Sequence, residues 1–216
     1  MTVRSWRLTT TGLALLIRAA AVSACGFRDE GTPIVLEQLI EDSKRHITAM
    51  ESTTLNNHRL SAEEAQALAA YAAAHPDDTA YHALLALRRS AAPQYQQLAA
   101  TVKASILCGA LATQKHLNDW GYLDPAESHD GEAAQALLEL GAAARPCLTT
   151  LLDARTPVTL FGGEEATMSS DYRYRRADFA HRYLTRILGE TPAFDPDPAR
   201  RDEAIDALKR RLVQGR

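Results

Sequence analysis

The side chains best suited to chemistry gather in one stretch, KHLNDWGYLDPAESHDGE, at residues 115–132. Imidazole and carboxylate groups bind divalent metal ions and act as general acids and bases. No spacing here matches a metalloprotease helix or a calcium-binding loop. We therefore expect a structural connector pinned to the core by Trp120 and Tyr122, with a metal or acid–base site as the alternative. The groups available to that site are His116, Asp119, Asp124, Glu127, His129, Asp130 and Glu132, of which His116, Asp119, His129 and Asp130 are the candidate metal ligands.

A second polar stretch, residues 154–171, contains two adjacent glycines and two acids in the run FGGEE. No lysine follows the glycine pair, which excludes a P-loop for phosphate. The stretch is longer than most connections between helices, and long connections often carry function. We expect a solvated loop, in which the two acids could cap a short helix through Met168. A partner-binding loop built on Phe161, Glu164 and Glu165 is the alternative.

Aromatic and cationic side chains alternate in YRYRR at residues 172–176, as they do in proteins that bind single-stranded nucleic acid. The charge balance argues against that partner. The formal net charge is -3, and the first 25 residues hold three arginines and no acid, so the rest of the chain is near -3 - 3 = -6. We expect these residues to open a helix, with Arg175 and Arg176 pairing with Asp171 or Asp178. No GxSxG element supports hydrolase chemistry, and no motif indicates a cofactor.

The first 24 residues have the layout of a secretory signal. Arg4 and Arg7 precede an apolar run from Leu8 to Ala24, which ends in small residues. The run is short and interrupted by Arg18, so it is poorly suited to span a membrane. We expect residues 1–24 to direct export and to be removed.

The run Val22-Ser23-Ala24-Cys25 resembles the lipobox of bacterial lipoproteins. The resemblance implies that Cys25 is lipidated and anchors the mature chain to a membrane, with residues 25–32 as a tether. Gly26 follows the cysteine, and the absence of aspartate there resembles outer-membrane sorting in Gram-negative lipoproteins. The alternatives are ordinary cleavage after Ala24 with secretion as a soluble protein, or a cytosolic helix that starts at Leu8.

Alanine and leucine dominate the rest of the sequence, while β-branched and aromatic residues are sparse, which predicts one all-α domain over residues 33–216. The clearest local signal is AQALLELGAAARPCLTTLLD at 134–153. It predicts two short amphipathic helices, the first ended by Gly141 and the second begun at Pro146. The other expected elements are helices at 33–50, at 61–74 behind a Ser61–Glu64 capping box, around Tyr81, Leu84 and Leu85, from Pro93 with a division near Gly109, at 172–188 and at 199–213, and a loop at 53–60.

Two cysteines, Cys108 and Cys147, remain after Cys25. Both lie on apolar helical stripes, where cysteines are more often buried thiols than bridged pairs. Export would permit a disulfide, but its formation depends on a geometry that spacing along the chain does not reveal. Two buried thiols are the favoured prediction.

The pattern Leu137-x-x-Leu140-Gly141-x-x-Ala144-x-Pro146-x-Leu148-x-x-Leu151-Leu152-Asp153 resembles a HEAT repeat, and the helix after residue 176 resembles the start of another. The likeness extends over about residues 131–189. It implies an irregular HEAT-like array of helical hairpins or a helical bundle, because the 154–171 stretch interrupts the repeat spacing. Such arrays usually bind other proteins.

These observations predict an exported, lipid-anchored, non-enzymatic helical protein that binds or scaffolds an envelope protein of unknown identity. The alternatives are an exported enzyme or metal-binding protein that uses residues 115–132, or a periplasmic inhibitor or immunity-type protein.

Overall fold

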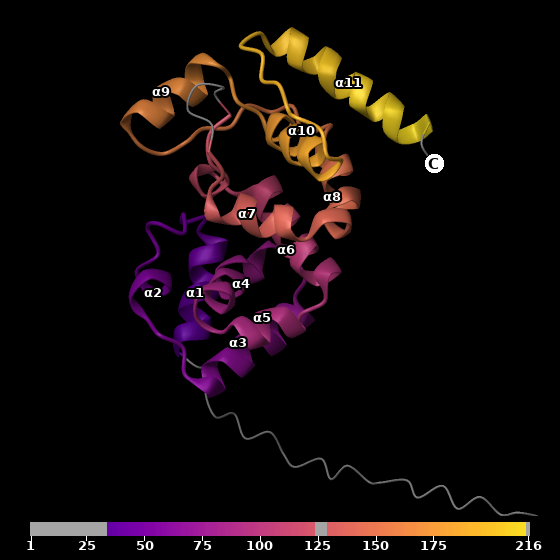
Figure 1. The fold of residues 1–216 in the computed structure, drawn as a ribbon. Helices are drawn as coiled ribbons and strands as arrows, with labels where there is room; N and C mark the ends of the chain where they lie inside the picture. The colour runs from indigo at the N-terminus through magenta and orange to yellow at the C-terminus, as the bar shows by residue number, and fades with distance from the viewer. Residues whose placement is uncertain (1–33, 124–128, 215–216) are drawn as a thin grey trace, which may run out of the picture. The chain divides into compact units, whose positions relative to one another are not determined.

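The structure, a computed structural model, describes residues 34–123 and 129–214, and most of these residues lie in helices (Figure 1). These residues contain no β-strand, which confirms the all-α prediction. The export segment, Cys25 and the tether lie outside the described residues. The α-helices are α1 Ile34–Lys44, α2 Thr53–Asn57, α3 Ala62–Ala74, α4 Tyr81–Ser90, α5 Ala92–Gln97, α6 Ala100–Thr113, α7 Glu132–Glu139, α8 Arg145–Leu151, α9 Gly163–Asp171, α10 Arg176–Ile187 and α11 Pro198–Gln214.

Helices α1 to α6 form the first group of helices, and α4 lies at its centre. It packs against α1, α3, α5 and α6, and Leu84, Leu85 and Leu87 on it are fully buried. The preceding helix α3 starts where the sequence predicts. The Ser61 hydroxyl accepts the Glu64 N–H, and the Glu64 carboxylate accepts the Ser61 N–H, so the predicted capping box is confirmed.

The break between α5 and α6 corrects one sequence prediction. The chain leaves the helical conformation at Leu98, which is buried, and Gly109 lies inside α6. A Cβ atom at Gly109 would lie 3.1 Å from the Asp78 backbone nitrogen. The glycine therefore permits close packing between α6 and the turn before α4 instead of dividing the helix. Residues 53–57, predicted as a loop, form the short helix α2, capped by Ser52.

The predicted corner between α7 and α8 is confirmed and refined. Gly141 has φ +54°, the left-handed conformation that ends a helix, and Pro146 lies in the first turn of α8. A short 3₁₀ turn, η3 (Gly141–Ala144), joins the two helices. Figure 1 shows α8 beside α10, and these two helices pack directly.

The cysteine pair departs from the favoured prediction. Cys108 of α6 and Cys147 of α8 form a disulfide, with their Cα atoms 6.0 Å apart. The two positions are 39 residues apart in sequence, and the corner at Gly141 turns α8 back against α6. Tertiary packing therefore supplies the geometry that the spacing of the cysteines could not predict.

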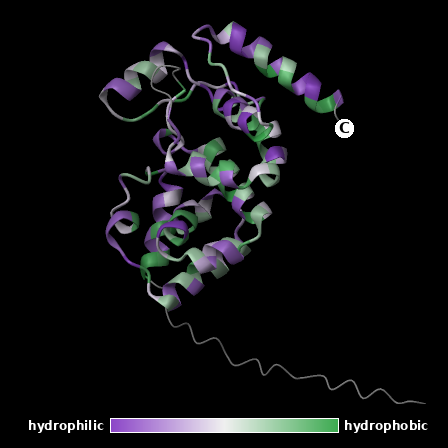
Figure 2. Cartoon of the chain, in the orientation of Figure 1, coloured by the Kyte–Doolittle hydropathy of each residue, from purple (hydrophilic) through white to green (hydrophobic). Residues whose placement is uncertain are grey.

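The C-terminal elements differ from the prediction at two boundaries. Residues 163–171, expected as part of a loop, form α9, while α10 begins at Arg176 rather than Tyr172 because Arg173 adopts φ +50°. Helix α11 follows the turn at 190–197 and buries only Arg201, Ile205 and Leu208 completely. Figure 2 accordingly shows hydrophilic residues along much of α11.

Candidate functional site

Asp119, the most central of the predicted metal ligands, is a structural residue. Its carboxylate accepts hydrogen bonds from the Ala49 N–H at 2.8 Å and from the Tyr81 hydroxyl at 2.9 Å. The residue is 8% exposed, and burial raises the pKa of its carboxyl group. Burial likewise raises the pKa of Tyr81 well above its ordinary value, so the phenol stays a donor. We call Asp119, Tyr81 and Ala49 the Asp119 hub.

The other predicted ligands lie in separate environments. Asp130 forms ion pairs with Arg182 and Arg186 of α10. The His129 ring packs on Tyr122, with ring centroids 4.3 Å apart. Within the described ranges, no group of three or more His, Cys, Asp or Glu side chains could hold a metal ion. His116, Asp119, His129 and Asp130, the candidate ligands of the alternative metal site, do not come together in such a group, and Asp124 and Glu127 lie outside those ranges.

The connector role predicted for residues 115–132 is supported by how the segment closes on itself. Trp120 is fully buried, and its carbonyl accepts the Tyr183 hydroxyl at 2.5 Å. The Tyr122 N–H donates to the His129 carbonyl at 3.0 Å, so the two ends of the segment meet. At this crossing Gly121 has φ +89°, and a Cβ atom there would lie 2.1 Å from the His129 carbonyl oxygen. Only glycine fits that position.

The segment before α9 places one aromatic side chain at the surface. The Leu117 N–H donates to the Thr159 carbonyl at 3.2 Å, and the Val158 N–H donates to the Tyr174 carbonyl at 2.7 Å. Val158 and Leu160 are buried, while Phe161 is 48% exposed. Buried and exposed residues thus alternate over residues 158–161, as expected for an extended segment that packs one face against the core.

The backbone of Phe161 is held at both of its polar groups. The Asn118 side-chain amide donates to the Phe161 carbonyl at 2.6 Å, and its oxygen accepts the Phe161 N–H at 2.6 Å. The His116 ring lies edge-on to the phenyl ring at a centroid distance of 5.8 Å, and its Nδ1 contacts the Thr159 hydroxyl at 3.3 Å. Hydrogen bonds thus fix the backbone that carries the exposed phenyl ring.

The two acids of the FGGEE run have different roles. The Glu165 carboxylate accepts the Tyr122 hydroxyl at 2.7 Å, and this bond lowers its pKa. Glu164 is exposed in the first turn of α9. Both acids lie at the N-terminal end of the helix, where negative charge is favoured. The short helix behind them was anticipated only through Met168; it continues to Asp171.

The arginines of the run at residues 172–176 form contacts within the protein. Arg175 pairs with Asp178 at 2.8 Å and with Asp202 at 2.7 Å, which confirms the predicted Arg175 ion pair. Arg176 instead donates to the Leu111 and Gln114 carbonyls at the end of α6, at 3.0 and 2.7 Å. Both guanidinium groups thus fasten α10 to its neighbours.

Comparison with known proteins adds no relative. No family model, curated protein or solved structure matches this chain. None of the helices in the described part is long and apolar enough to cross a membrane.

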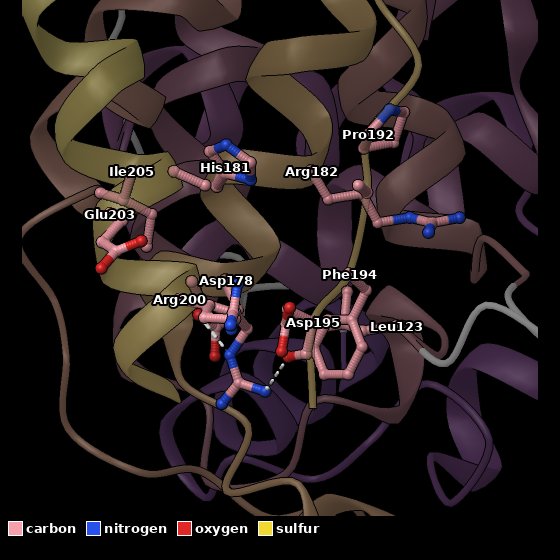
Figure 3. A pocket seen from close by; sticks show the side chains of 13 residues that line it. Leu123, Asp178, His181, Arg182, Pro192, Phe194, Asp195, Arg200, Glu203 and Ile205 are labelled. Atoms are coloured by element: carbon pink, nitrogen blue, oxygen red, sulfur yellow. Dashed lines mark hydrogen bonds and ion pairs between the residues drawn. The ribbon is translucent and has the colours of Figure 1, made fainter. Parts of the chain in front are cut away.

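A pocket that the sequence analysis did not anticipate lies between α10, the 190–197 turn and the start of α11 (Figure 3). Its volume is about 450 Å³. The sequence predicts a proline-rich turn at residues 192–198 and gives no signal for a cavity. The lining combines apolar side chains with seven ionisable ones: Asp178, His181, Arg182, Asp195, Arg200, Arg201 and Glu203.

Proposed function

We propose that this protein is exported, anchored to a bacterial membrane through lipidated Cys25, and binds an envelope protein through its helical domain. The contact surface we assign is the Phe161 face, defined as Phe161, His116 and Glu164. The observation that carries the proposal is the half-exposed Phe161 ring on a backbone held at both polar groups by Asn118.

A fixed aromatic residue suits protein recognition for two reasons. Aromatic side chains dominate the energetics of protein interfaces because they bury a large apolar area with few rotatable bonds. Holding the backbone in advance also reduces the entropy lost on association. Exposed single hydrophobic residues are common on protein surfaces. Asn118 holds both backbone polar groups of Phe161, whereas at Met50, which is 67% exposed, a side chain holds only the carbonyl.

Two further features support the export and the binding role. The lipobox-like run before Cys25 predicts the anchor, and a disulfide between Cys108 and Cys147 is typical of proteins in oxidising compartments. The HEAT-like pattern at 131–189 favours a protein-binding array, by analogy of architecture alone. The lack of aspartate after Cys25 favours the outer membrane.

A site-specific photocrosslinker tests the contact surface. We expect a crosslinker at position 161, in cells of the native organism, to capture a defined envelope protein. The same group at position 50 is the matched control, because Met50 is also exposed. A protein captured at 161 and absent at 50 supports the proposal; identical products, or none, from both positions would overturn it. A hydrolase or toxin as the captured protein would specify the inhibitor or immunity role.

Substitution of Cys25 tests the anchor separately. We expect the Cys25→Ala protein to lose the acyl mass and to leave the membrane fraction, or to accumulate unprocessed with its signal segment. Intact mass of the wild-type mature chain should equal residues 25–216 plus lipid, less two hydrogens for the disulfide. A wild-type mass without lipid that begins at Cys25 would instead indicate secretion as a soluble protein.

A further inference from the structure

The α10–α11 pocket has the size and the apolar walls of a small-ligand site. Its volume of about 450 Å³ falls within the roughly 300–1,000 Å³ typical of ligand pockets. Phe194 and Leu123 line one side, and Ile205 lies across from them (Figure 3). A ligand in this space would therefore bury apolar surface between the turn and α11.

One side of the pocket is formed by charged groups that pair with one another. Asp178 is paired with Arg175 at 2.8 Å and with Arg201 at 3.3 Å. Arg201 also donates to the Asp195 carbonyl at 3.1 Å, and its guanidinium carbon lies 4.7 Å from the centre of the Phe194 ring. These groups are occupied by one another. They therefore stabilise the shape of the pocket. The groups free to select a ligand are the charged side chains at its opening, which we call the rim.

The rim carries charges of both signs. Arg200 and Glu203, both exposed on the first turns of α11, form no ion pair with any described residue. Asp195 uses one carboxylate oxygen to accept the Asp197 N–H at 2.8 Å. The rim groups outside the ion pairs are therefore one guanidinium and two carboxylates. His181 and Arg182 line the pocket as well, and Arg182 is paired with Asp130 at 3.5 Å. A guanidinium binds a carboxylate in a two-pronged fashion, and carboxylates bind an ammonium group.

We propose that this pocket binds a short zwitterionic peptide of two or three residues with an apolar side chain. Arg200 takes the terminal carboxylate, Asp195 and Glu203 take the terminal ammonium, and the side chain lies between Phe194 and Ile205. A simple anion or a fatty acid would engage only the Arg200 guanidinium at the rim, whereas a zwitterion engages the guanidinium and the two carboxylates together. The pocket shares no residue with the Phe161 face, so the proposal stands independently of the partner-binding proposal.

Calorimetric titration of the mature chain with leucyl-phenylalanine, its N-acetyl form and its C-terminal amide tests this assignment. We expect each capped form to bind at least about tenfold more weakly than the free dipeptide, since each cap removes one rim contact, on the scale of 1.4 kcal/mol per tenfold change. Arg200→Gln should weaken the free dipeptide about tenfold and leave the amide unaffected. Glu203→Gln should weaken the free dipeptide and leave the N-acetyl form unaffected.

Arg210→Gln is the matched control, because Arg210 is an exposed cation on the same helix outside the pocket. It should leave all affinities unchanged, and circular dichroism should show that the three variants are folded. Equal affinity for free and capped peptides would overturn the proposal, as would absence of binding at millimolar dipeptide. Equal losses of dipeptide affinity in Arg200→Gln and Arg210→Gln would overturn it too, since they would indicate non-specific electrostatic attraction to the helix.

Discussion

Two polar regions of this protein are built in opposite ways. The Asp119 hub lies inside the first group of helices, and its hydrogen bonds join segments 38 and 70 residues apart. Helix α11 is attached partly by the buried Arg201, which pairs with Asp178 at 3.3 Å. Its other ion pairs lie near the surface, among them Arg155 with Asp202 at 2.5 Å and with Asp206 at 2.6 Å. The hydrogen bonds of the hub are all shielded from water, whereas water and salt reach most of the ion pairs of α11.

The difference predicts which region governs global stability. A buried donor left without its acceptor costs its full desolvation free energy, whereas an exposed ion pair contributes little and is screened by salt. The hub should therefore open only with the whole domain. Helix α11 buries only Arg201, Ile205 and Leu208 among its 17 residues, so it should detach locally.

The largest expected effect comes from removing the hub acceptor. Asp119→Ala leaves the Tyr81 hydroxyl and the Ala49 N–H buried without a partner, and we expect a loss of about 4 kcal/mol in the free energy of unfolding. Asp119→Asn is the control, since an amide oxygen keeps one acceptor and removes the buried charge. It should lose less than half as much in chemical denaturation. Equal losses in both variants would show that the hydrogen bonds are not what stabilises the hub.

A second effect, of about 3 kcal/mol, concerns His82, which lies next to Tyr81. Its Nδ1 lies 3.0 Å from the Ser43 hydroxyl oxygen, which donates its own hydrogen to the Leu39 carbonyl. The same hydroxyl oxygen accepts the His82 backbone N–H at 3.1 Å, so Ser43 holds both the backbone and the ring of His82. Burial lowers the pKa of His82 to about 4.

The sign of the pH dependence follows from that pKa. The unfolded chain takes up a proton near pH 6.5, while the folded chain resists it until about pH 4, so stability falls as the pH drops through this range. His82→Asn retains a donor to Ser43 and does not titrate. The difference in unfolding free energy between wild type and His82→Asn should shift by about 3 kcal/mol between pH 7.5 and pH 4. A difference that stays constant over this range would contradict the assignment.

The smallest effect tests α11. Arg155→Ala removes two partly exposed ion pairs, and we expect about 1 kcal/mol less protection from hydrogen exchange in α11 at low salt, with α4 unchanged. The loss should shrink at 0.5 M salt, because screening already weakens these pairs in the wild type. Arg210→Ala serves as the control because Arg210 forms no ion pair with a described residue. Loss of protection in α4 as well would show that α11 is part of the global folding unit.

The sequence predicted helix boundaries best where the residues that set the boundary lie within one or two helical turns of each other. The Ser61–Glu64 capping box, the left-handed Gly141 and Pro146 at the start of α8 all depend on neighbours within four residues. The same local logic failed at Gly109, where the reason for a glycine is the backbone of Asp78, 31 positions earlier. It also missed α2 and placed the end of α9 three residues early, at Met168, since helices this short depend on packing.

The sequence by itself thus determined the all-helical class, the corner at 140–146 and the pinning of residues 115–132 by Trp120. Only the tertiary structure decided that the Asp119 carboxylate accepts hydrogen bonds from Ala49 and Tyr81 inside the core, and that Cys108 meets Cys147. It alone placed the Phe161 ring on a fixed backbone and formed a pocket beside α11. The physical reason is range: helix propensity and capping act within a few residues, whereas ligation, bridging and cavity formation depend on which distant segments pack together.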